Sequence, residues 1–162
     1  MDLYSLEFPL LIFTVIANIA IDIIILLYAK NSQGRNYFVL FVLSQTIWIV
    51  VNYFSFQVTN EQWLFMARLT LLSAVPHPVL FFLFIYTFLR KEPIIKKWQQ
   101  FLFFSLMLAL GILALSPYLF TQLGNRNGVL VPIPGPGMAV FGFYVVSFIG
   151  AAFFVLFKRW KK

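Results

Sequence analysis

The chain has 162 residues, of which 62% are hydrophobic and 10% are charged, and its formal net charge is +7. Soluble domains are roughly 45–50% apolar and about 25% charged, so this composition excludes an ordinary soluble domain. The absence of cysteine excludes disulfides and Cys-ligated zinc, and the basic residues stand in short clusters beside apolar runs, a pattern that argues against nucleic-acid binding.

The first two predicted elements are apolar runs over residues 6–29 and 37–56. Each approaches or exceeds the ~20 residues that an α-helix needs to cross the hydrocarbon of a membrane. Acidic rather than basic residues precede the first run, so we expect an uncleaved span and not a signal peptide. The short polar turn between the runs contains Gly34 and predicts that the two helices are antiparallel neighbours.

The third run covers residues 63–89 and contains the sequence Pro76, His77, Pro78. Each proline removes a backbone hydrogen-bond donor and crowds the preceding turn. A membrane helix tolerates this where neighbouring groups satisfy the freed carbonyls. We therefore predict one long helix with a kink at the two prolines, which are the candidate hinge.

The fourth run covers residues 98–120, and the fifth covers residues 138–157. Between them, residues 121–137 contain three prolines and four glycines and cannot form a helix across their length. This segment predicts an exposed, partly rigid outer loop. The fold expected for residues 1–162 is a single all-α membrane domain, a polytopic bundle of five transmembrane helices.

The distribution of charge predicts the orientation of the bundle. Alternating the loops between the two sides of the membrane places ten of the twelve basic residues on one side, which the positive-inside rule assigns to the cytoplasm. The N-terminus is then outside and the C-terminus is cytoplasmic. These ten residues are Lys30, Arg35, Arg90, Lys91, Lys96, Lys97, Lys158, Arg159, Lys161 and Lys162.

Polar residues inside the first two spans form the first group of candidate functional residues. The charged side chain of Asp22 is energetically costly to bury in hydrocarbon, so we expect it to have either an interaction partner or a functional role. Asn18 stands one turn earlier on the same face, and the helical rise places Asp22 near the depth of Ser44 and Gln45. One interpretation is a polar clasp between helices. The other is a carboxylate that senses protons or cations.

Arg68 and His77 form the second group, in the third span. Arg68 either extends its side chain to the outer head groups or faces an outward-open cleft, where it would hold an anionic or carbonyl-bearing ligand. His77 either hydrogen-bonds a carbonyl that the prolines free or acts as a titrating switch. With one histidine and no cysteine, we expect no metal site, no cofactor and no catalytic constellation.

Three stretches of the sequence resemble a known family. They are residues 36–54, NYFVLFVLSQTIWIVVNYF, with Trp48 deep in the second span; residues 67–87, ARLTLLSAVPHPVLFFLFIYT; and the Gly-Pro-Gly of 135–137 that opens into the fifth span. Together they resemble the N-terminal multi-span sensor region of bacterial membrane histidine kinases, a region of seven-helix type. Trp48 joins the candidate ligand-binding residues on this ground.

The resemblance implies a non-catalytic, membrane-embedded signal-input domain in the bacterial inner membrane. It also implies a homodimer and a cytoplasmic kinase or output module. In that family two further helices and the kinase module follow the fifth span, so we expect either a sensor portion truncated after that helix or a stand-alone relative. Two alternatives from other classes stay open: an accessory or structural membrane subunit, and, on the strength of Asp22, Arg68 and His77, a small-molecule or ion transport component.

Overall fold

The computed structural model describes residues 4–58, 62–88, 95–126 and 129–160. Within this part of the chain, five helical segments are long and apolar enough to cross a membrane, and the third of them is built from two helices, α3 and α4. The elements in chain order are α1 (Tyr4–Tyr28), α2 (Gln33–Ser55), α3 (Trp63–Ala74), α4 (Pro76–Phe88), α5 (Lys97–Leu115), β1 (Phe120–Arg126), β2 (Val129–Pro134) and α6 (Gly137–Trp160).

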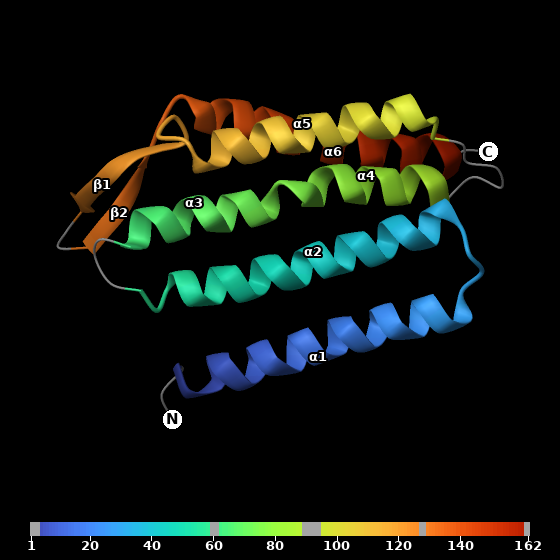
Figure 1. Cartoon of the computed structure of the whole chain (residues 1–162), viewed down its shortest axis with the longest axis horizontal. Helices are drawn as coiled ribbons and strands as arrows, with labels where there is room; N and C mark the ends of the chain where they lie inside the picture. Colours follow the sequence, from blue (N-terminus) through green and yellow to red (C-terminus); the bar gives the residue numbers. More distant parts are fainter. Residues whose placement is uncertain (1–3, 59–61, 89–94, 127–128, 161–162) are drawn as a thin grey trace.

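The spans lie roughly side by side (Figure 1). The helix α1 forms one edge of the bundle and packs against α2, which in turn packs against α3 and α4. On the far side of α3 and α4 lie α5 and α6. The antiparallel hairpin of β1 and β2 projects at the end where α3 begins and α5 ends. We call this the hairpin end and the opposite one the basic end.

The connection between α1 and α2 shows how a short polar sequence determines the geometry of two helices. The Ser32 hydroxyl accepts a hydrogen bond from the Arg35 backbone N–H and caps α2. The Arg35 guanidinium donates to the Ala29 carbonyl at 3.2 Å and to the Asn31 side chain at 2.8 Å. Since a helix leaves its last carbonyls without partners, Arg35 satisfies the C-terminus of α1 while it starts α2.

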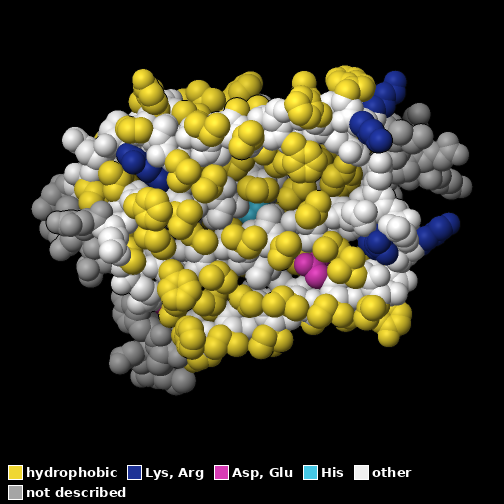
Figure 2. Space-filling model, in the orientation of Figure 1, with side chains coloured by type: hydrophobic (Ala, Val, Ile, Leu, Met, Phe, Trp, Pro, Cys, Tyr) yellow, Lys and Arg dark blue, Asp and Glu magenta, His cyan; other side chains and the backbone are white. Residues whose placement is uncertain are grey.

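The buried core is centred on α4. Val79 and Leu83 of this helix are fully buried, and the helix as a whole contacts α2, α5 and α6. Gly34 permits the start of α2 to lie close to the end of α4, because a Cβ at this position would lie 3.4 Å from Thr87 and Phe88. Large apolar side chains cover the outer surface of the bundle, as expected where the solvent is lipid (Figure 2).

The described part of residues 121–137 contains more structure than the irregular loop expected there. Ser116 and Pro117 end the helical run, so α5 stops at Leu115 and not near residue 120. Six pairs of residues then align in the hairpin, from Phe120 opposite Pro134 to Arg126 opposite Val129. The composition excluded a helix correctly, but the pairing of two short strands was not predicted.

Candidate functional site

The third span is interrupted at Val75, in the region where the sequence predicts a kink. The helix α3 ends at Ala74 and α4 begins at Pro76. Pro76 and Pro78 have no N–H to donate to the carbonyls one turn earlier, Leu72 and Ala74. The Val75 N–H shares its hydrogen bond between the Leu71 and Leu72 carbonyls, at 3.1 and 3.2 Å, and so partly compensates for the missing donor.

A side chain from another span enters this break. The Tyr144 hydroxyl, from the buried face of α6, donates a hydrogen bond of 2.5 Å to the Val75 carbonyl. A phenol from α6 therefore meets the backbone of the third span at the point where its helix is interrupted, and a contact of this kind can hold a helix kink.

His77 lies beside the break, between aromatic rings of α2. Its ring stands edge-on to Trp48, with centroids 5.9 Å apart, and to Phe41 at 6.4 Å. The ring also lies close to the backbone of Ser44. Within the described residues the buried Nε2 atom has no hydrogen-bond partner.

An intramembrane cavity of about 280 Å³ adjoins this histidine. Gln45 and Phe41 contribute from α2, His77 and Phe81 from α4, and Val145 from α6. Three spans therefore meet at one small cavity beside the kink. It is large enough for a few water molecules, which would supply a partner for His77.

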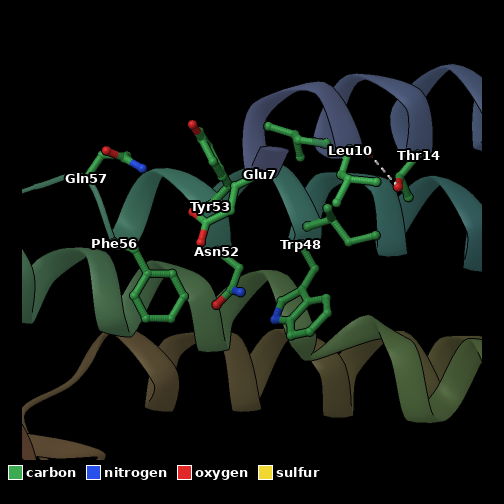
Figure 3. A pocket seen from close by; sticks show the side chains of 10 residues that line it. Glu7, Leu10, Thr14, Trp48, Asn52, Tyr53, Phe56 and Gln57 are labelled. Carbon is green, nitrogen blue, oxygen red and sulfur yellow. Dashed lines mark hydrogen bonds between the residues drawn. The ribbon is translucent and has the colours of Figure 1, made fainter. Parts of the chain in front are cut away.

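A larger cleft of about 700 Å³ opens between α1 and α2 at the hairpin end. Figure 3 shows Glu7 and Leu10 reaching from α1 toward α2, whereas Trp48 points from α2 toward α3 and α4. Trp48 therefore lines the cleft with part of its indole and contacts His77 with another part. The ten residues that line the cleft are Glu7, Leu10, Leu11, Thr14, Trp48, Ile49, Asn52, Tyr53, Phe56 and Gln57.

The polar residues of the first span lie elsewhere, and they pair differently from the prediction. The Asn18 amide donates to the Thr46 hydroxyl at 3.0 Å, so Asn18 forms the clasp between α1 and α2. The Ser44 hydroxyl donates to the Phe41 carbonyl of its own helix. Within the described residues the buried Oδ1 of Asp22 has no partner. Depth along the helices placed Asp22 level with Ser44, but the clasp depends on which face each helix turns inward.

Arg68 connects the third span to the hairpin. Its guanidinium donates a hydrogen bond of 2.6 Å to the Phe120 carbonyl, the first residue of β1. Its Nε is buried and has no partner within the described residues. The side chain thus points at the protein backbone, and neither a head group nor a ligand is needed to account for its position.

Of the predicted site residues, the structure brings together Gln45, Trp48, His77 and the two prolines. It separates from them the Asn18 clasp, Asp22 and Arg68. Two residues of the site were missed by the sequence analysis. Tyr144 is a phenol in an apolar span and Glu7 shares a helical face with Thr14, and these patterns were the available signals.

The arrangement contains no cluster of three or more histidine, aspartate or glutamate side chains among the residues that the structure describes. The polar groups around the kink are separate and differ in depth, so they offer hydrogen bonding and packing rather than a nucleophile with its base. The geometry can couple the cleft between α1 and α2, the interrupted third span and α6 by contact.

The chain matches a known family. The family model described as the N-terminal 7TM region of histidine kinase matches residues 10–162. The match therefore includes the first span from residue 10 onward, the other four helical spans and the hairpin between the last two. No curated protein and no solved structure matches the chain.

Proposed function

Because this chain belongs to the family of N-terminal 7TM regions of histidine kinases, we propose that it receives a signal in the membrane and passes it through α6 to a cytoplasmic output module. The family supports a sensory role, and the region matched is the sensory one rather than the catalytic kinase domain. The stimulus reaches the protein at the cleft between α1 and α2 or through the bilayer. A homodimer in a bacterial inner membrane is part of the same proposal.

The distribution of charge supports the direction proposed for this signal. Basic side chains gather at the end opposite the hairpin, as Figure 2 shows. The described ones come from the turn after α1, the first turn of α2, the start of α5 and the end of α6; Arg90, Lys91, Lys161 and Lys162 lie outside the described residues. The positive-inside rule then favours a cytoplasmic basic end and an N-terminus outside.

The contacts supply a continuous physical route across the bundle. Trp48 lines the outer cleft and stands against His77, which follows the break in the third span. Tyr144 holds the carbonyl at that break and belongs to α6. A change in the position of Trp48 would therefore move the kink, and a change in the kink would move or release α6.

The observation that carries the proposal is the hydrogen bond between Tyr144 and Val75. A buried donor and acceptor that separate must each find another partner, at a cost of about 1–3 kcal/mol. The pair consequently favours two discrete arrangements, bonded and released, over a continuous deformation. Switching elements commonly depend on such alternatives, whose populations a signal can shift.

Distances between spin labels test the proposal directly. The chain has no cysteine, so labels attach only where cysteine is introduced. Phe88 at the end of α4 and Phe157 near the end of α6 are exposed and suit Phe88→Cys and Phe157→Cys in lipid nanodiscs. We expect Trp48→Leu and His77→Leu to change the distribution of distances between the two labels, whereas Trp98→Leu on the exposed face of α5 leaves it unchanged.

An unchanged distribution in both variants would remove the basis for signal transmission through the kink. That outcome would favour the accessory-subunit interpretation, in which polar residues inside the spans only hold helices together. Circular dichroism of each variant checks that the helical content is preserved, so that a lost distance peak is not confused with unfolding.

A further inference from the structure

We propose that the outer cleft between α1 and α2 binds an amphipathic organic cation, a molecule with an ammonium group attached to an apolar body. The statement that the cleft is an input site rests on the proposed function, whereas the chemical class of the ligand does not. The chemical class of the ligand follows from the ten lining residues.

The charge of the cleft favours a cation. Glu7 is the one acidic residue among the ten that line it, and none of the ten is lysine or arginine. The exposed Glu7 carboxylate lines the same cleft as Tyr53. Near the hydrocarbon the effective dielectric constant is lower than in water, so a carboxylate attracts a cation strongly and repels a ligand anion.

The aromatic side chains favour an ammonium group over a metal ion. Trp48, Tyr53 and Phe56 line the cleft, and the face of an aromatic ring attracts an organic cation. Contacts of Tyr53 with Phe8 and Phe54, at centroid distances of 6.0 and 5.5 Å, hold its ring in place. A metal ion would need several oxygen ligands, whereas an ammonium group needs one carboxylate and aromatic surface.

The remaining lining residues favour an apolar body on the same ligand. Leu10, Leu11 and Ile49 provide aliphatic surface deeper in the span than Glu7. Asn52 and Gln57 add amide oxygens, which accept hydrogen bonds from an ammonium that carries protons. The volume of about 700 Å³ is within the range of small-molecule sites, roughly 300–1,000 Å³.

The position of the cleft explains how such a ligand would act. An apolar body inserted between α1 and α2 would contact Trp48, whose indole also meets His77. Because α1 packs mainly against α2, the cleft can widen without breaking the core around α4. The bound cation would thus bias the kink through a single aromatic side chain.

Binding of matched probes tests the chemical class. Benzyltrimethylammonium is the cationic probe, and neopentylbenzene, in which carbon replaces the charged nitrogen, is its neutral isostere. Phenylalanine at positions 63, 98 and 160 leaves Trp48 as the only tryptophan, so that its fluorescence reports occupancy of the cleft. In nanodiscs of uncharged lipid we expect saturable binding of the cation, with the isostere on the order of tenfold weaker.

Two carboxylate variants separate specific recognition from general charge attraction. Glu7→Gln is expected to weaken cation binding on the order of tenfold and to leave binding of the isostere unchanged. Asp22→Asn removes the other carboxylate of α1 that the structure describes, outside the cleft, and is expected to retain cation binding. Equal binding of the two probes, or equal losses in both variants, would overturn the inference.

The outcome is distinguishable from failure of the proposed function. If the cation binds as expected but the label distance between α4 and α6 stays constant in every variant, the ligand class stands and signal transmission fails. If the distances respond to Trp48→Leu and His77→Leu while the cation is not preferred, transmission stands and the ligand class is wrong.

Discussion

The hydroxyl of Tyr144 on the last helix hydrogen-bonds the carbonyl of Val75, the residue at which the third span is interrupted. The two residues are 69 positions apart, and both are buried. This contact makes the prolines of one helix and the position of another helix interdependent. The predictions below test it and three other contacts that hold the bundle together.

Tyr144→Phe should destabilise the fold and loosen α6 against α4. The variant keeps the ring and removes the donor, so the Val75 carbonyl is left without its partner in a region where water does not replace it. Interhelical hydrogen bonds in membranes contribute about 0.6 kcal/mol on average and up to about 1.7 kcal/mol, and we expect a loss toward the upper figure. Unfolding in mixed micelles with increasing dodecyl sulfate measures it.

The matched control for this variant is Tyr28→Phe. Tyr28 ends α1 and is 84% exposed, so removal of its hydroxyl should change the unfolding free energy by less than about 0.5 kcal/mol. Equal losses in Tyr144→Phe and Tyr28→Phe would contradict the importance of the contact at the kink.

Asn18→Ala should weaken the attachment of α1. Asn18 and Thr46 form the clasp between α1 and α2, and α1 has its main contacts with α2 alone. A double-mutant cycle with Thr46→Val isolates the pair, with an expected coupling of about 0.6–1.7 kcal/mol. Energy transfer between fluorophores on α1 and α2 gives an independent measure of their separation. Additive effects of the two substitutions would mean that the clasp contributes nothing.

Arg68→Met should release the start of the hairpin while the spans persist. The guanidinium of Arg68 bonds the Phe120 carbonyl, and methionine keeps most of the apolar stem without the donor. We expect hydrogen exchange of the hairpin amides to accelerate several-fold, with little change in α2 or α4. Arg159→Met, at the opposite end of the bundle, is the control and should leave hairpin exchange unaffected. Protection that is unchanged in Arg68→Met would contradict the role assigned here.

Gly135→Ala should disrupt the junction between the hairpin and α6. The Gly135 N–H donates to the Leu119 carbonyl at 2.8 Å, and a Cβ at Gly135 would collide with the Tyr118 carbonyl. Because the obstacle is backbone, the junction must shift, and we expect a loss of about 1–3 kcal/mol. Micelle unfolding measures it.

Gly142→Ala is the matched control for the junction. No atom lies within 4 Å of a Cβ built at Gly142, which is on an exposed face of α6. Alanine has the better helix propensity by about 1 kcal/mol, so this variant should be neutral or slightly stabilising. Similar destabilisation by both alanines would mean that the collision with the Tyr118 carbonyl does not explain the effect at Gly135, since nothing obstructs a Cβ at Gly142.

The sequence by itself determined that the chain lies in a lipid bilayer, where its helical spans are, and which family it belongs to. Five apolar runs of sufficient length require five spans, whatever their arrangement, because every backbone group in lipid must be satisfied within a helix. Pro76 and Pro78 determined where the third span is interrupted, since neither can donate to the preceding turn. The clustering of basic residues distinguished one end of the bundle from the other, although the side of the membrane that each end faces stays a prediction.

Only the tertiary structure decided which faces meet. A membrane helix is apolar on all sides, so its sequence has no polar face from which its rotation can be read. The sequence analysis placed Asp22 near Ser44 from their depth alone. In the structure Asn18 and Thr46 form the hydrogen bond between α1 and α2 instead, because the rotation of the two helices about their axes brings these side chains together. The hydrogen bond between Tyr144 and Val75 likewise depends on the rotation of each helix and on the packing of helices that are far apart in the chain. No local sequence pattern carries this information.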